Sequence, residues 1–347
     1  MYSQQMSSEV SQREVVPNRK AVALFSGGLD SALAVRLVKD QGIEVTAIHF
    51  TSFFSPTGVD REDSAVSALA RELGVPLVFL SRGETFVEIV RNPRYGHGKN
   101  MNPCVDCRIH TFRKAKAYME QIGASFMVTG EVVGQRPMSQ RKHTIRFIEK
   151  QAECDGIVLR PLSAKLMPQT LVETEGIVDR NRLLDISGRG RKVQLRLAKE
   201  LGITGYSSPA GGCLLTEVTY SRRLKDLFED GSDLSPADLE ALKVGRHIRV
   251  RPGLKLVVAR NERENYLLES VGLAGPKFLP VEFPGPTAIA VGNPSAEEKL
   301  LIASVIRRYS KESARGEWIE VDDPATGTDR VRTQDVAGED WIAAHMV

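Results

Sequence analysis

The chain has 347 residues, 41% of them hydrophobic and 26% charged, so it is long enough for two domains of ordinary globular composition. It has no apolar run of about 18 residues, which excludes a membrane-spanning helix, and we expect no membrane partner. The first 18 residues are polar and lack the hydrophobic stretch of a signal peptide, which predicts a disordered tail and a cytoplasmic protein. The net charge of +3 is too small to identify a nucleic-acid-binding protein by itself.

Strands and helices are expected to alternate along the first third of the chain. Compact apolar runs predict strands at residues 21–25, 45–50, 76–80 and 126–129. Apolar residues at helical spacing predict helices at residues 31–39, from an N-cap at Asp60 to about 73, and after Cys107. This alternation predicts an α/β fold with a doubly wound parallel sheet, in which ligands bind at the carboxyl ends of the strands.

The pattern changes in the second half of the chain. Residues 226–241 are acidic and rich in helix-breaking residues, so we expect a linker there. Beyond it, Ser295 and Glu298 form a capping box that starts a helix. Short strands separated by Pro and Gly are expected at residues 247–250, 254–258 and 288–291. The sequence therefore predicts a first domain at 19–225 and a smaller α+β domain at 242–347.

Basic residues are concentrated in two places. Between residues 243 and 260 there are six and no acid: Lys243, Arg246, Arg249, Arg251, Lys255 and Arg260. The second group consists of Arg180, Arg182, Arg189, Arg191 and Lys192. Such groups suit the phosphate backbone of RNA, although a solvated basic face gives the same pattern.

The junction between the first strand and the first helix has the composition of a phosphate-binding loop. Its residues are Ser26, Gly27, Gly28, Leu29, Asp30 and Ser31. Backbone N–H groups and the helix dipole converge there on an anion, and the two glycines let a phosphate approach closely. Bare phosphate would repel Asp30, so this carboxylate is better suited to hold Mg²⁺ on the phosphates. The lysine of a Walker A loop is absent, and a plain tight turn is the structural alternative.

This segment resembles the PP-loop of the ATP pyrophosphatases, a superfamily with an adenine nucleotide alpha hydrolase-like fold. The resemblance covers roughly residues 20–220. It implies that the loop binds the pyrophosphate of ATP, that adenine lies near His49 and Phe50, and that AMP is transferred to a substrate oxygen. A uracil carbonyl oxygen is a poor leaving group, but once adenylated it departs as AMP when sulfur attacks.

Two of the four cysteines form a C-x-x-C pair at the start of a predicted helix. In a reducing compartment such a pair indicates metal or redox chemistry, and the helix dipole favours the thiolate. The segment N-P-C-V-D-C at residues 102–107 resembles that of bacterial tRNA 2-thiouridine synthases, in which the second cysteine, here Cys107, is catalytic. A distant cysteine faces it in those enzymes, which implies Cys213 here. Cys154 fits no such pattern and is expected to be structural.

Three chemistries remain open for these thiols. Cys104, Cys107 and Cys213 together could ligate a [4Fe–4S] cluster whose fourth iron binds hydrosulfide, and the extra Cys104 favours this reading. Alternatively, one cysteine carries a persulfide and its partner resolves it by disulfide formation. A zinc site with His97 or His110 as fourth ligand is the third option.

A second signature follows the strand at 126–129. The sequence T-G-E-x-x-G-Q-x-x-S-Q at residues 129–140 resembles a segment of tRNA 4-thiouridine synthases, which also carry R-P-L, here at residues 160–162. We expect Gly130 to allow close approach to a nucleotide and Glu131 to assist metal or substrate binding. Taken alone, the segment could equally be a polar loop.

The last 110 or so residues resemble the RNA-binding domain of the NFACT family, on the segment at 252–261 together with Asn265 and Leu267. The 18 residues before the first strand leave no room for the N-terminal RNA-binding region of 4-thiouridine synthases. We therefore expect RNA contact through the C-terminal domain.

Together these features predict an ATP- and Mg²⁺-dependent tRNA sulfurtransferase that adenylates O2 or O4 of a uridine and replaces it with sulfur. Its expected partners are tRNA and a sulfur donor, either sulfide or a persulfide carrier, and a homodimer is left open. Two alternatives are an amide-forming ligase acting on a small acid, and a nucleotide-sensing RNA-binding protein.

Overall fold

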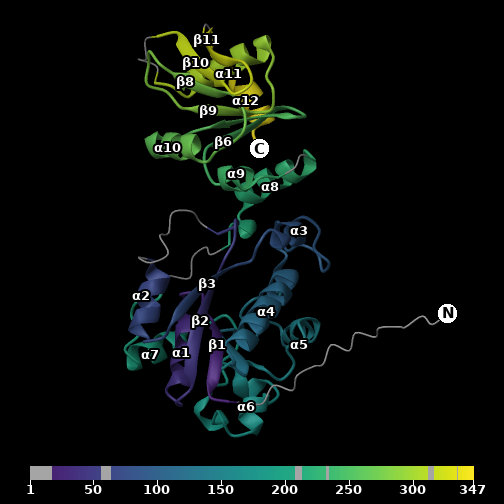
Figure 1. Ribbon diagram of the computed structural model, residues 1–347, viewed down its shortest axis with the longest axis vertical. Coiled ribbons are helices and arrows are strands. Elements are labelled where there is room, and N and C mark those ends of the chain that lie inside the picture. Colours follow the sequence, from purple (N-terminus) through teal and green to yellow (C-terminus); the bar gives the residue numbers. More distant parts are fainter. Residues whose placement is uncertain (1–17, 56–63, 208–212, 232–233, 312–315, 334) are drawn as a thin grey trace, which may run out of the picture.

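The computed structural model describes residues 18–55, 64–207, 213–231, 234–311, 316–333 and 335–347. The predicted tail up to residue 17 and the predicted N-cap Asp60 lie outside these residues. The chain forms two modules, one around each sheet, with two helices between them (Figure 1). Within the described residues, no helix has the length and apolar character needed to cross a bilayer.

The first sheet is parallel throughout, in the order β3-β2-β1-β4-β5. Its strands are β1 (Lys20–Leu24), β2 (Glu44–Thr51), β3 (Leu77–Ser81), β4 (Phe126–Thr129) and β5 (Val158–Leu159). Because the chain runs outward from β1 to β3 and then returns to β4 on the other side, the carboxyl ends of β1 and β4 form the crevice where such sheets bind ligands. The predicted doubly wound α/β fold is confirmed.

Helices cover both faces of this sheet (Figure 1). They are α1 (Leu29–Lys39), α2 (Ala65–Glu72), α3 (Thr85–Arg91), α4 (Cys104–Gln121), α5 (Lys142–Gln151), α6 (Leu171–Thr174) and α7 (Lys192–Glu200). Short 3₁₀ turns are η1 (Ala164–Leu166), η2 (Arg180–Arg182) and η3 (Leu214–Thr216).

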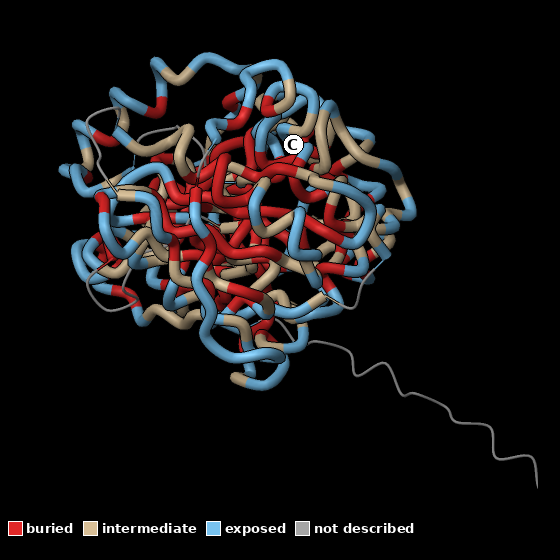
Figure 2. The backbone as a smooth tube through the Cα atoms, turned by 90° about the horizontal axis from the view of Figure 1, so that it is seen from above, coloured by how far each residue is buried: buried red, intermediate tan, exposed pale blue. Residues whose placement is uncertain are grey.

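Alternation along β1 explains the two layers of the core. Ala21 and Ala23 pack in the cluster that contains α1, whereas Val22 and Leu24 pack in the cluster that contains α4. Both faces of the strand are therefore apolar, as expected for a buried parallel sheet. Figure 2 shows the resulting buried interior enclosed by exposed loops.

The second module is built on an antiparallel sheet of order β11-β10-β8-β9-β7-β6. Its strands are β6 (Arg246–Arg251), β7 (Leu254–Val258), β8 (Lys277–Pro280), β9 (Ala288–Val291), β10 (Trp318–Asp323) and β11 (Gly327–Arg332). Its helices are α10 (Glu262–Ser270), α11 (Ala296–Arg308) and α12 (Glu339–His345). The predicted capping box is present, because Ser295 accepts from the Glu298 N–H and Glu298 accepts from the Ser295 N–H.

Two helices lie between the modules, α8 (Val218–Glu229) and α9 (Pro236–Ala241) (Figure 1). The interval predicted as a linker, 226–241, contains the end of α8 and all of α9. On one side α8 packs with Phe54 and Phe86 of the first module. On the other side its Asp226 pairs with Arg249 of β6 at 2.8 Å. The connection between the modules is therefore a packed helix.

Candidate functional site

The loop at residues 26–31 follows β1 at the crevice of the parallel sheet. Gly27 has φ of +77°, and a Cβ added there would lie 2.7 Å from Val66 Cγ2, so both its backbone conformation and its surroundings favour glycine. Ser31 Oγ donates to the Gly28 carbonyl at 2.8 Å and lies 3.1 Å from Ser26 Oγ. Within the described residues no side chain caps α1, so its first N–H groups are available to an anion.

Gly130, at the end of β4, packs directly against the first turn of α1. An added Cβ would lie 2.5 Å from both the Asp30 carbonyl carbon and the Ser31 nitrogen. The close approach expected at this glycine is thus an approach to the protein's own phosphate loop. It sets the position of the loop relative to β4.

Asp30 lies where two sequence features meet. Gln135, from the second signature, donates to Asp30 Oδ2 at 3.0 Å, and Arg191, from the second basic group, lies 3.4 Å from the same oxygen. The other oxygen, Oδ1, is buried and has no hydrogen-bond partner among the described residues. A carboxylate with one anchored oxygen and one free oxygen fits the role of a Mg²⁺ ligand. Local sequence did not indicate the contacts of Gln135 and Arg191.

Glu131 is held by two arginines. Its side chain is 2% exposed and pairs with Arg108 at 2.7 Å and Arg160 at 3.0 Å. Burial alone would raise the pKa of Glu131, but the two guanidiniums outweigh it and the pKa is lowered. Both oxygens are engaged, which leaves none for a metal, so we assign Glu131 to positioning. Arg160 belongs to the R-P-L segment, so its pair with Glu131 joins that segment to the T-G-E signature. Arg160 also pairs with Glu149.

His49 and Phe50 lie on opposite faces of β2. His49 shares the α1 face with Ala47, and its Nδ1 lies 3.0 Å from the Phe25 carbonyl oxygen. Burial lowers the pKa of His49, which favours its neutral form. Phe50 packs in the core beneath α4, with the Arg82 guanidinium 5.6 Å from its ring centroid. Of the two, only His49 faces the side of the sheet from which α1 leaves the phosphate loop.

The C-x-x-C pair occupies the first turn of α4, which begins at Cys104. Asn102 Nδ2 donates to Cys104 Sγ at 3.1 Å. Two bonds bring the loop before α4 to the segment after Cys213: Asn100 Nδ2 donates to the Thr216 carbonyl at 2.6 Å, and the Met101 N–H donates to Ser221 Oγ at 3.4 Å.

Cys213 lies close to both cysteines of the pair. The pKa of its thiol is raised to about 11, first by desolvation and then by Cys107 and Cys104, with Arg82 opposing. Cys213 as a whole residue is exposed, so its thiol is only partly desolvated and solvent can reach it. The segment after Cys213 is therefore held against the loop that leads into α4, and Cys213 lies within electrostatic range of Cys107 and Cys104.

No group of three or more His, Cys, Asp or Glu side chains is arranged to hold a metal ion in the described part of the chain. The Nε2 atoms of His97 and His110 bond to the carbonyls of Val90 and Arg82, so neither histidine is turned toward the thiols as a zinc ligand. As arranged here, the three cysteines do not fit a [4Fe–4S] cluster either. Cys154 is buried, which raises the pKa of its thiol to about 12, in keeping with an inert structural residue.

The basic stretch at 243–260 proves to be largely neutralised by acids from elsewhere in the fold. Its ion pairs are Lys243–Glu240, Arg249–Asp226, Arg251–Glu298, Lys255–Asp226 and Arg260–Glu264. All four acids lie outside the stretch: Asp226 and Glu298 are distant in sequence, and Glu240 and Glu264 lie three and four residues beyond its ends, so the pattern within the stretch could not show the pairing. The stretch is therefore not a bare cationic surface.

Comparisons with known proteins agree with this geometry. Residues 17–166 match the family described as thiamine biosynthesis protein (ThiI), and residues 245–343 match the NFACT protein RNA binding domain. The expected resemblance to PP-loop tRNA thiolation enzymes and to the NFACT domain is confirmed.

Curated proteins that this chain resembles are named as tRNA thiolation enzymes. The tRNA-specific 2-thiouridylase MnmA of Clostridioides difficile is 25% identical over 230 residues, which cover 60% of this chain and 58% of that protein. The bifunctional protein NifU/MnmA of Rubrobacter xylanophilus is 32% identical over 164 residues, covering 44% and 32%. The chain thus spans less than two thirds of the length of these relatives. A solved 4-thiouridine synthetase–RNA complex with bound ATP is 23% identical, with a TM-score of 0.39 over 65% of this chain and 53% of that one.

Proposed function

We propose that this protein is an ATP-dependent tRNA sulfurtransferase that adenylates a carbonyl oxygen of a uridine and replaces that oxygen with sulfur. The observation that supports the proposal is that the loop before Cys104 and Cys107 is hydrogen-bonded to the segment after Cys213. The residue after Cys107, Arg108, pairs with Glu131, and Glu131 follows the glycine that packs on the phosphate loop. Thiol chemistry and nucleotide binding are thereby coupled through adjacent residues.

In this proposal the ATP phosphates bind the open N–H groups of α1 and the hydroxyls of Ser26 and Ser31, with adenine on the His49 side of β2. Mg²⁺ would be held by Asp30 Oδ1 and would supply charge neutralisation on the phosphates. Arg191 and Gln135 keep Asp30 in place through its other oxygen. The uridine carbonyl oxygen attacks the α-phosphorus, and pyrophosphate leaves.

Sulfur then arrives as a persulfide on Cys107, formed when the Cys107 thiolate takes the outer sulfur of a persulfide carrier, which leaves as a thiol. The terminal sulfur attacks the adenylated carbon, and AMP leaves with the original carbonyl oxygen. The Cys213 thiolate next attacks Cys107 Sγ, which forms a disulfide and releases the thiouridine, and an external thiol reductant restores both cysteines. Because the pKa of Cys213 is about 11, it must lose its proton for this last step. The arrangement of the thiols favours this route over the cluster.

The NFACT-type domain gives the proposed enzyme its RNA contact. Since most cations of the 243–260 stretch are paired, we expect contact to be distributed over the module and over Arg189 and Lys192, near the phosphate loop, for which the described residues show no ion pair. Phosphate contacts of this kind hold the RNA without reading its sequence.

The direct test of the reaction is pyrophosphate release from ATP with and without unmodified tRNA, paired with an iron count on protein purified without oxygen. We expect release to depend on tRNA, to fall at least 100-fold in Asp30→Ala, and to proceed in iron-free protein. Release that is independent of tRNA would contradict the RNA substrate. A stoichiometric four-iron content with loss of thiolation on iron removal would contradict the persulfide route while leaving the reaction itself in place.

A further inference from the structure

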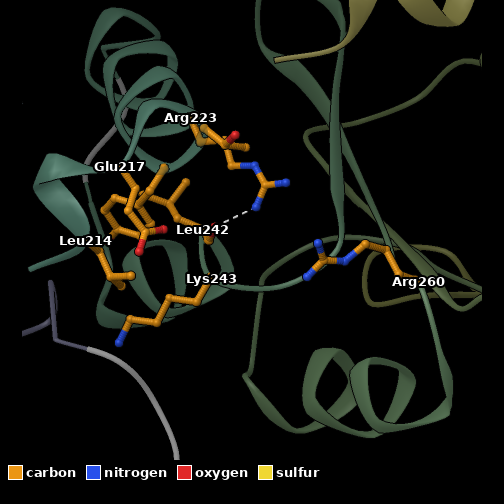
Figure 3. A pocket seen from close by; sticks show the side chains of 8 residues that line it. Leu214, Glu217, Arg223, Leu242, Lys243 and Arg260 are labelled. Carbon is orange, nitrogen blue, oxygen red and sulfur yellow. Dashed lines mark hydrogen bonds between the residues drawn. The ribbon is translucent and has the colours of Figure 1, made fainter. Parts of the chain in front are cut away.

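A pocket of about 350 Å³ lies between α8 and the start of the second module (Figure 3). Its lining residues are Leu214, Glu217, Thr219, Tyr220, Arg223, Leu242, Lys243 and Arg260. Leu214 is the residue next to Cys213, so the pocket adjoins the thiols on one side and the RNA-binding domain on the other. Its volume is within the range of small-ligand sites.

Two buried polar side chains in the pocket each have one atom without a hydrogen-bond partner among the described residues. Tyr220 is 4% exposed, and its hydroxyl has no hydrogen-bond partner among the described residues. Arg223 is 8% exposed; its terminal nitrogens donate to the carbonyls of Leu242 and Gly245 at 2.9 Å, but its Nε has no partner among these residues. Within the described chain no carboxylate pairs with Arg223. Leaving such groups unsatisfied is costly, which indicates a missing ligand.

The electrostatics indicate that this ligand is an anion. The guanidiniums of Arg223 and Arg260 point toward one another across the pocket (Figure 3). Burial and then the charge of Arg260 lower the pKa of Arg223 to about 10, with the Glu264 carboxylate opposing them. Arg260 is half-exposed and forms an ion pair with Glu264, and Lys243 forms an ion pair with Glu240. The one carboxylate that lines the pocket, Glu217, faces it from the opposite side (Figure 3).

We propose that this pocket binds a backbone phosphate of the RNA substrate, between the guanidiniums of Arg223 and Arg260 and beside the Tyr220 hydroxyl. The identity of the ligand rests on the proposed function, because RNA is the anion that must reach from the second module to the thiols. Two converging guanidiniums match phosphate oxygens in geometry and charge. The bound phosphate holds the strand next to Cys213.

The test measures the affinity of an unmodified tRNA transcript for the full chain over a range of salt concentrations. Tyr220→Phe removes only the unpartnered hydroxyl, so no internal hydrogen bond is lost. We expect about threefold weaker binding. Arg260→Gln is expected to weaken binding about tenfold and to reduce the salt slope by about one. Arg36→Gln makes the matching arginine change at another i,i+4 pair, with Asp40 at the end of α1, outside the proposed RNA contacts, and should leave affinity unchanged.

The outcomes separate this inference from the proposed function. If wild type binds RNA and Tyr220→Phe and Arg260→Gln bind it equally well, the pocket inference is wrong, whether or not wild type makes thiouridine. If these variants lose affinity but wild type forms no thiouridine, the pocket stands and the proposed function falls. If millimolar inorganic phosphate raises the melting temperature of wild type but not of Tyr220→Phe, while RNA affinity is unaffected, the pocket serves a small anion and the inference is wrong.

Discussion

At the scale of single residues, the candidate site depends on contacts that leave no space for an extra atom. Gly130 lies against the backbone of Asp30 and Ser31, which a side chain could not displace without moving α1. Gly27 has a left-handed backbone, and a Cβ added there would lie 2.7 Å from Val66 Cγ2. These two glycines fix the phosphate loop against β4 and α2, so the loop's N–H groups are preorganised for an anion.

Gly130→Ala should therefore destabilise the protein by about 1–3 kcal/mol and weaken ATP binding, because relief of the overlap displaces the first turn of α1. Denaturant unfolding and ATP titration calorimetry measure the two effects. Gly338→Ala is the matched control, since an added Cβ there meets no atom within 4 Å and the backbone needs no positive φ. Unchanged ATP affinity in Gly130→Ala would show that the contact does not position the loop.

Glu131 gives a second prediction, with a defined pH dependence. Glu131→Gln removes one of the two carboxylates that pair with the buried Arg160 and should cost about 3 kcal/mol at pH 7. Since the pKa of Glu131 is lowered below its usual 4.5 in the folded protein, the stabilisation is present above pH 4.5 and is lost as the pH falls through the folded value. The stability difference between wild type and the variant should thus shrink below pH 4.5. A difference that is constant with pH would contradict the ion-pair assignment.

At the scale of elements, α4 connects the C-x-x-C pair to Glu131, and α8 connects the Cys213 segment to the second module. α4 presents Cys104 and Cys107 in its first turn and links them through Arg108 to Glu131. α8 follows Cys213 and pairs its Asp226 with Arg249 and the nearly buried Lys255 of the second module. The position of Cys213 relative to the second module is therefore set by a single helix.

Asp226→Asn should destabilise the second module by about 3 kcal/mol, because it leaves the Lys255 ammonium buried without its carboxylate. Glu229→Gln on the same helix removes an exposed pair with Lys225 and should change stability by less than about 1 kcal/mol. Denaturant unfolding followed by tryptophan fluorescence separates the two, since Trp318 and Trp341 both lie in this module. If the two variants change stability equally, Asp226 does not stabilise the second module through its pairs with Arg249 and Lys255.

Most elements with strong local patterns could be predicted from sequence. The strands at 126–129, 254–258 and 288–291 coincide with β4, β7 and β9, because each is a compact apolar run. Polar strands could not be found this way. β11 reads G-T-D-R-V-R and is mostly exposed, so only its ladder with β10 makes it a strand.

At the scale of the whole molecule, sequence motifs indicated which chemistry to expect but not which residues meet. The loop at 26–31 was recognisable from its place between a strand and a helix and from its resemblance to a PP-loop, and the C-x-x-C pair from its spacing. The contact of Gln135 and Arg191 with Asp30, the neutralised basic stretch and the Tyr220 pocket each join residues far apart in sequence. Such contacts depend on the fold, and a single sequence carries no local signal for them.

The central claim is that thiols from two remote loops act together beside the nucleotide loop. The most direct measurement is mass spectrometry of nucleosides after incubation of unmodified tRNA with ATP, a persulfide sulfur donor, a thiol reductant and the enzyme. The account predicts thiouridine with wild type and with Cys154→Ala, which changes only a structural thiol, and none with Cys107→Ser or Cys213→Ser. Undiminished thiouridine formation by either serine variant, or none by wild type, would contradict it.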